Sequence, residues 1–126
     1  KCNNYNNIIG GCDMIKLVKD MDERILGTIG LVTPNSQAIM VDNILVGIID
    51  YKVTTDFIKI MYITVLDEYR RQGIAGKIIT MLKEEHQGKY MYGDSLPGAI
   101  DFWERMGAEF DEEDDDDYCT PFHILC

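Results

Sequence analysis

The fold of this chain is decided by residues 63–77, which read ITVLDEYRRQGIAGK. The β-branched residues at the start are typical of a strand, and apolar residues from Ile74 to Leu82 recur with the period of a helix. Between them stand Gly73 and Gly76, whose small size allows the backbone to approach a ligand closely. The stretch therefore predicts a strand, a tight turn and a helix that begins near Gly73.

The turn between this strand and this helix has the properties of an anion-binding site. The first turn of a helix has N–H groups without internal partners and carries a partial positive charge, so a diphosphate is a natural occupant. Arg70, Arg71 and Lys77 add positive charge around it. Ordinary tight turns use the same residues, and the spacing matches neither a nucleotide P-loop nor a dinucleotide fingerprint. The pattern alone therefore leaves the ligand open.

Three apolar runs precede the turn, over residues 37–41, 44–53 and 57–66. Their separators are short and polar, which predicts an antiparallel meander of hairpins. Before them, apolar residues recur at helical spacing between Asp13 and Gly27, which predicts a first helix capped by these two residues. Residues 1–12 have no periodicity and are predicted to be irregular.

The pattern after the turn predicts a crossover between parallel strands. The helix from Gly73 is predicted to end at about His86, and residues 89–94 are typical of a strand. Ser95 is predicted to cap a second helix that ends at Gly107, and a hairpin over residues 108–110 and 118–125 closes the chain. These elements predict a single α/β domain over residues 1–126, with a mixed sheet.

The composition excludes several classes of partner. Although the formal net charge is −10, residues 111–117 read DEEDDDD, so most of the acidity is local. No basic stretch is interleaved with aromatic residues, so neither nucleic acid nor an anionic membrane is expected as a partner. The four cysteines lack the spacing of a structural metal site. Their even number leaves disulfides open, but the apolar composition favours free thiols in a cytoplasmic protein.

Two stretches of the chain, the turn and residues 99–110, carry a resemblance to a known family. The turn reads Arg70-x-x-Gly73-x-Ala75, which resembles the [Q/R]-x-x-G-x-[G/A] turn of the GNAT superfamily of acyl-CoA-dependent N-acyltransferases. Residues 99–110 resemble that family's A-x-x-F-Y-x-x-x-G-F helix and strand, and the whole resemblance covers about residues 37–125. It implies a mixed, largely antiparallel twisted sheet, flanked by helices, whose central parallel strands splay apart around pantetheine.

The resemblance also implies a reaction and a set of binding residues. The co-substrate is acetyl-CoA, no metal takes part, and a primary amine attacks the thioester directly. The amine would belong to a polyamine-like small molecule or to a protein lysine or N-terminus, and the enzyme would be a monomer or homodimer. The implied cofactor-binding residues are Ile63, Thr64 and Val65 for the pantetheine arm and Arg70, Arg71, Gln72, Gly73, Ile74, Ala75, Gly76 and Lys77 for the diphosphate.

The sequence departs from the family pattern where the family places its proton-transferring groups. Trp103 stands where many relatives have a tyrosine acid, and an indole N–H is not a useful acid, so Trp103 is predicted to be a core residue. The strand over 57–66 has no carboxylate, so the base must come from elsewhere or be water. Among the side chains we expect Asp94 first and Glu68 second, with Tyr92 as a relay. Each of these three also has an ordinary structural interpretation. The alternative function is a catalytically weak CoA-binding or protein-interaction module.

The acidic run at residues 111–117 has two interpretations. It precedes the last strand of the closing hairpin, which borders the acceptor side in this architecture, so it could attract a cationic acceptor. Runs of like charge are more often solvated loops that keep a protein soluble. Both interpretations stay open at this point.

Overall fold

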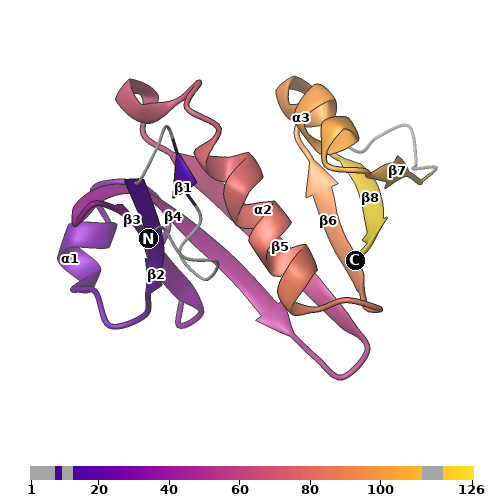
Figure 1. Ribbon diagram of the computed structural model, residues 1–126, viewed down its shortest axis with the longest axis horizontal. Coiled ribbons are helices and arrows are strands. Elements are labelled where there is room, and N and C mark those ends of the chain that lie inside the picture. The colour runs from indigo at the N-terminus through magenta and orange to yellow at the C-terminus, as the bar shows by residue number, and fades with distance from the viewer. Residues whose placement is uncertain (1–7, 10–12, 112–117) are drawn as a thin grey trace.

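The computed structural model describes residues 8–9, 13–111 and 118–126, of which 8, 9 and 13 are described by their backbone alone. The described strands form one sheet in the order β1-β2-β3-β4-β5-β6-β8-β7 (Figure 1). Their bounds are Ile8–Ile9, Asp13–Val18, Ser36–Val41, Ile44–Val53, Phe57–Val65, Tyr90–Ser95, Glu109–Phe110 and Thr120–Leu125 for β1 to β8. The helices are Glu23–Leu26 (α1), Ile74–Glu85 (α2) and Ile100–Arg105 (α3), and 3-10 turns cover Asp67–Tyr69 (η1) and Pro97–Ala99 (η2).

The pairing of the strands confirms the predicted fold class. The pair β5–β6 is parallel, and the other neighbouring pairs are antiparallel. The three predicted runs before the turn are β3, β4 and β5, and they form the expected meander. The β3–β4 turn consists of Asp42 and Asn43, both with positive φ (50° and 66°), as a tight two-residue hairpin requires. The sheet is therefore mixed and largely antiparallel.

The predicted helix between Asp13 and Gly27 is wrong over most of its length. Residues 13–18 form β2, whose Ile15 and Leu17 pack on one core cluster while Val18 packs on the other. The alternation of Ile15, Lys16 and Leu17 is too short to stand out because Val18 is apolar as well, and the spacing of Ile15 and Val18 imitates a helix. Of the predicted helix, only Glu23–Leu26 are helical and form α1, and Gly27 caps its C-terminal end as predicted.

Two other predictions also need correction. Ile8 and Ile9 form β1, paired with β2, in a segment predicted to be irregular; the rest of residues 1–12 lies outside the described residues. Ser95 does not cap a helix, because it is buried in β6 and its hydroxyl donates to its neighbour Leu96. Pro97 and Gly98 follow in a 3-10 turn, which delays the start of α3 to Ile100.

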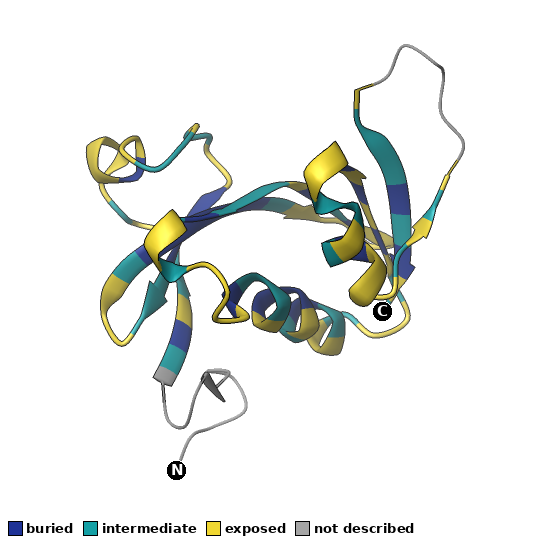
Figure 2. Ribbon diagram, turned by 90° about the horizontal axis from the view of Figure 1, so that it is seen from above, coloured by how far each residue is buried: buried dark blue, intermediate teal, exposed yellow. Residues whose placement is uncertain are grey.

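The helices cover both faces of the sheet. On one face, α2 and α3 enclose the larger core cluster, in which Ile78 and Leu82 of α2 and Trp103 of α3 are buried with Met91 and Phe122 of the sheet. On the other face, α1 covers a smaller cluster around Leu26, Ala38 and Ile48. Figure 2 shows α1 and α2 on opposite sides of the strands. Burial on both faces fixes the central strands, on which the site described below depends.

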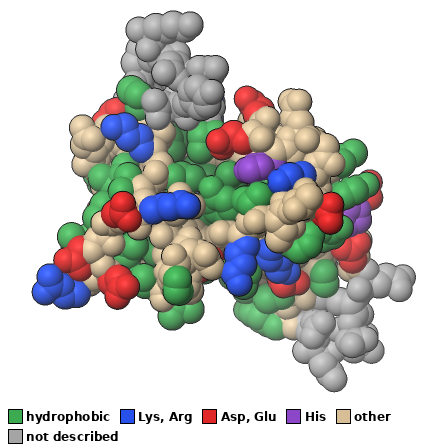
Figure 3. Space-filling model, turned by 90° about the horizontal axis from the view of Figure 1, so that it is seen from below, with side chains coloured by type: hydrophobic (Ala, Val, Ile, Leu, Met, Phe, Trp, Pro, Cys, Tyr) green, Lys and Arg blue, Asp and Glu red, His purple; other side chains and the backbone are tan. Residues whose placement is uncertain are grey.

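The surface of the described residues is mixed in character. On the face drawn in Figure 3, basic and acidic side chains are interspersed among hydrophobic ones. Within residues 8–9, 13–111 and 118–126, no helix combines the length and the apolar character that crossing a bilayer demands. The same part of the chain has no group of three or more His, Cys, Asp or Glu side chains arranged to hold a metal ion.

Candidate functional site

The parallel strands β5 and β6 separate partway along their length. They are in register through Phe57–Tyr90, Ile58–Met91 and Lys59–Tyr92. Beyond Lys59, β5 continues to Val65 beside β4 alone, and beyond Tyr92, β6 continues to Ser95 beside β8 alone. The two strands thus form a V with its apex at Lys59 and Tyr92.

A cleft of about 730 Å³ occupies this V. One wall is β5 over residues 60–65, and the opposite wall includes Gly93 and Asp94 of β6 with Phe102 and Trp103 of α3. A Cβ on Gly93 would lie 2.5 Å from Cζ of Phe122, so only glycine lets this ring pass beneath β6. The Phe122 ring stacks in turn on Trp103, with centroids 4.3 Å apart. Gly93 therefore shapes the inner wall of the cleft.

The glycine turn lies at the open end of the V, where β5 leads through η1 to α2. Gly73 is the N-cap of α2 with φ of +75°, and Arg71 also has a positive φ of +69°. The first internal bond of the helix runs from the N–H of Lys77 to the carbonyl of Gly73, at 3.0 Å. The N–H groups of residues 74–76 thus have no acceptor within the helix. A Cβ on Gly73 would meet nothing within 4 Å, so the space beside Gly73 is open.

The side chains of the turn divide into two groups. Arg70 holds the turn to the strand, because its Nε donates to the carbonyl of Val65 at 2.9 Å and its guanidinium pairs with Asp67 at 2.8 Å. Ile74 is buried in the core, so it presents only its backbone to the turn. The side chains of Arg71, Gln72 and Lys77 are exposed and are free to approach an anion at the helix terminus.

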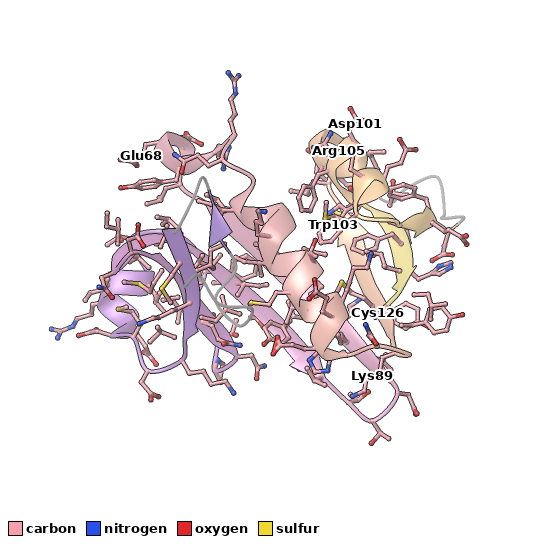
Figure 4. The ribbon with its side chains drawn as sticks, viewed as in Figure 1. Glu68, Lys89, Asp101, Trp103, Arg105 and Cys126 are labelled. Atoms are coloured by element: carbon pink, nitrogen blue, oxygen red, sulfur yellow. The ribbon has the colours of Figure 1, made fainter. Side chains whose placement is uncertain are left out.

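The three predicted proton-transferring residues lie at different distances from the cleft. Asp94 lines it, and its Oδ2 is 3.7 Å from Nζ of Lys59. Tyr92 is two residues earlier on the same face of β6 but does not line the cleft. Glu68 is exposed on η1, and Figure 4 shows it on the opposite side of α2 from Trp103. Of the three, the structure brings Asp94 to the cleft.

An aromatic cluster on the open face of the sheet was not foreseen from the sequence. The ring of Tyr92 lies 5.8 Å from that of Phe57 and 6.5 Å from His123, and Tyr90 lies 6.0 Å from His123. The alternation of Tyr90 and Tyr92 in the sequence does indicate a shared face. Their partners come from β5 and β8, however, and pairing over such separations has no local signal.

Carboxylates border this cluster. His123 Nδ1 lies 3.0 Å from Asp111, and His123 Nε2 lies 3.3 Å from Glu109. The hydrogen bond to Asp111, with a smaller effect of Glu109, raises the pKa of His123 above its ordinary value. The positive charge of the imidazolium is thus favoured in the folded state, where two carboxylates surround it.

Trp103 occupies a packing position, as predicted. It is 5% exposed, stacks on Phe122 and meets Phe102 edge to face at 4.9 Å. We expect Trp103→Phe to leave the rate of the predicted acyl transfer within about threefold of the parent, because phenylalanine preserves most of the packing volume and the lost indole N–H is not a useful acid. Steady-state kinetics of the two proteins measure this. A far larger fall in kcat, with the melting temperature preserved, would show that the indole takes part in the reaction.

Comparison with known proteins identifies the class. A parallel strand pair that splays beside a glycine turn at a helix N-terminus is the arrangement predicted for acyl-CoA-dependent N-acyltransferases. The model of the Acetyltransferase (GNAT) family matches residues 10–108. The chain therefore belongs to the GNAT acetyltransferase family, and the resemblance seen in the sequence is confirmed. It is an enzyme of the acyl-CoA-dependent N-acyltransferase class.

Solved structures share the fold at low sequence identity. Arabidopsis thaliana Naa50, in complex with the bisubstrate analogue CoA-Ac-MVNAL, superposes with a TM-score of 0.67 at 16% identity, over 89% of this chain and 99% of that one. The Bacillus subtilis N-acetyltransferase YlbP, in complex with coenzyme A, superposes with a TM-score of 0.69 at 12% identity, over 90% and 97%. A comparison with curated proteins finds no match.

Proposed function

We propose that this protein transfers the acetyl group of acetyl-CoA to a primary amine by direct attack. The observation that carries the proposal is the cleft between the separated strands, which runs from the N-terminus of α2 to the apex of the V. The related folds of Naa50 and YlbP were solved with a CoA analogue and with coenzyme A, which supports a CoA site in this architecture.

The turn and β5 would hold the co-substrate. In this proposal the diphosphate binds the free N–H groups at the start of α2, beside the exposed side chains of Arg71, Gln72 and Lys77. The pantetheine arm follows the backbone of Ile63, Thr64 and Val65. The β4–β5 register shifts at Met61, which has no partner residue opposite it on β4. We propose that a backbone N–H of β5 near this irregularity donates to the thioester carbonyl. One such donor contributes about 3 kcal/mol to transition-state stabilisation.

The proton of the attacking amine needs an acceptor more than the thiolate needs a donor. An alkylammonium group has a pKa near ~10.4, whereas a thiol near ~8.5 leaves readily. We assign the acceptor role to Asp94, because it borders the cleft and is exposed enough to pass a proton to water. Tyr92, on the same face, is the proposed relay, and Glu68 is the second candidate despite its distance from the cleft.

The acceptor approaches from the open face in this proposal, and we infer that it is cationic. Asp94, Glu109 and Asp111 are exposed there, and six further acidic residues follow Asp111 in the sequence, outside the described residues. A cytoplasmic location also belongs to the proposal. It is supported by Cys119 and Cys126, which are free thiols.

A cationic acceptor predicts a dependence on salt. Exposed ion pairs contribute only ~0 to 1 kcal/mol each and are screened beyond about 10 Å at 0.1 M salt. Raising the salt concentration from about 20 to about 300 mM should therefore raise the acceptor's KM while kcat barely changes. Replacing the four aspartates at residues 114–117 with asparagine should raise the acceptor's KM at low salt to the value that the parent shows at high salt. If the parent's KM for the acceptor does not change with salt concentration, the acidic run has no role in attracting the acceptor and serves only solubility.

The proposed function is tested by release of free CoA from acetyl-CoA in the presence of an amine panel. Polyamines, aminoglycosides, amino acids and peptides with free N-termini or lysines cover the acceptor classes. Stimulated CoA release, with the acetylated amine identified by mass spectrometry, is the expected result for at least one class. CoA binding without acetylation of any amine would instead favour a CoA-binding module.

A further inference from the structure

We propose that Lys59 is a self-acetylation site, at which the enzyme acetylates its own Nζ from bound acetyl-CoA when no acceptor is present. The inference rests on the proposed function and adds a substrate that lies within the protein itself. It depends on three observations: the place of Lys59 in the V, its contact with Asp94, and a neighbouring lysine that has neither feature.

Lys59 lies at the end of the path that the acyl group would follow. The strands separate immediately after the Lys59–Tyr92 pair, so Lys59 stands at the apex of the V. The pantetheine arm would enter at the Val65 end, next to the start of α2, and would run along β5 toward that apex. From Val65 to Met61 the strand advances about 13 Å, which brings the acyl end of an extended arm within two residues of Lys59.

The surroundings of Lys59 suit an amine that must lose a proton. Its Nζ lies 3.7 Å from Oδ2 of Asp94, which lines the cleft. The lysine side chain is 36% exposed and Asp94 is 52% exposed, so neither is locked in the core. A partly solvated pair of this kind exchanges readily between contact and separation, because its net stabilisation is small. The ammonium group can therefore leave Asp94 and turn toward the cleft after losing its proton.

The chemistry is the proposed acyl transfer with Lys59 as the amine. Asp94 accepts a proton from the ammonium, and the freed lone pair of Nζ attacks the thioester carbonyl carbon. The carbon–sulfur bond then breaks and CoA leaves as the thiolate, which takes up one proton from solvent. The nitrogen gives its second proton to water, and Asp94 returns the first to solvent. The products are an uncharged acetyl-lysine and free CoA, with the net release of one proton.

Lys52 provides a matched comparison within the same sheet. It pairs with Lys59 in the β4–β5 register, so the two lysines occupy neighbouring positions on one face. Neither lysine lines the cleft itself, but Lys59 stands at its apex and contacts Asp94, which does line it, whereas Lys52 is one strand further from the V. A process that depends only on the exposure of an amine would modify both residues, whereas delivery through the cleft would select Lys59.

The test incubates the full chain with acetyl-CoA alone and follows each lysine by peptide mass spectrometry. Acetylation of Lys59 should be at least about tenfold faster than that of Lys52, because a positioned amine reacts at a high effective concentration. The rate per molecule should not depend on protein concentration. Lys59→Arg should remove the modification, and Gly73→Val should slow it at Lys59 while leaving Lys52 unchanged.

The other outcomes each overturn the inference in a distinguishable way. Equal rates at Lys59 and Lys52 would mean chemical acetylation by the thioester. A rate that rises with protein concentration would mean transfer between molecules. If the protein acetylates an added amine but Lys59 stays unmodified, self-acetylation is overturned and the proposed function stands. If neither Lys59 nor any added amine is acetylated, the proposed function is overturned as well.

Discussion

Asp94→Asn is expected to lower kcat at neutral pH by about a hundredfold, because proton transfer by a positioned group contributes that much or more. The amide keeps the size of the carboxylate at the cleft wall but cannot accept the proton of the amine. Its ion pair with Lys59 is half exposed, so its loss should cost little stability. Steady-state kinetics with a saturating amine measure the effect, and thermal melting confirms the fold.

Glu68→Gln is the matched control for this prediction. It changes a carboxylate to an amide on η1, none of whose residues lines the cleft. Ordinary turnover in the Asp94 variant, together with a large fall in the Glu68 variant, would move the base to Glu68. Ordinary turnover in both variants would leave water as the acceptor.

Gly73→Val is expected to weaken CoA binding by at least about tenfold, or roughly 1.4 kcal/mol. A β-branched residue is a genuine outlier at the φ of +75° that Gly73 adopts, so the turn must shift to accommodate it. Its branches would also enter the open space beside Gly73, where the diphosphate is proposed to approach. Calorimetric titration with CoA gives the affinity directly.

Gly88→Val separates backbone strain from loss of the site. Gly88 also has a positive φ, +90°, and a Cβ added there would meet nothing within 4 Å, but this glycine lies after the opposite end of α2. The variant should lose stability in the same way and keep its affinity for CoA. If Gly73→Val binds CoA like the parent, the glycine turn is not the diphosphate site.

The parts of this fold that were predictable carry their signal in short stretches. The turn at Gly73, the hairpin at Asp42 and Asn43, and the crossover through α2 each depend on residues adjacent in sequence. The prediction of a helix over residues 13–18 was wrong because pairing with β3 outweighed a local pattern that suited either structure. Likewise, serine is a preferred N-cap residue, but Ser95 is the last residue of β6 because it pairs with Thr120 of β8.

In the candidate site, too, only the part that depends on residues adjacent in sequence could be predicted. The half proposed to bind the diphosphate is a local motif, so its residues could be named from sequence. The contact of Lys59 with Asp94 joins β5 to β6, and the cluster of Phe57, Tyr92 and His123 joins β5, β6 and β8. These contacts arise from strand order, for which a single sequence has no local signal.

The most direct test of the account is amide hydrogen exchange with and without acetyl-CoA. A ligand in the V should slow exchange at residues 61–66 of β5 and its extension and at residues 71–77 of the turn and α2, because bound donors exchange only after the ligand leaves. ATP at the same concentration should protect these amides far less. Protection confined to other segments, such as the β3–β4 end of the sheet, or equal protection by ATP, would contradict the placement of acetyl-CoA between β5 and β6.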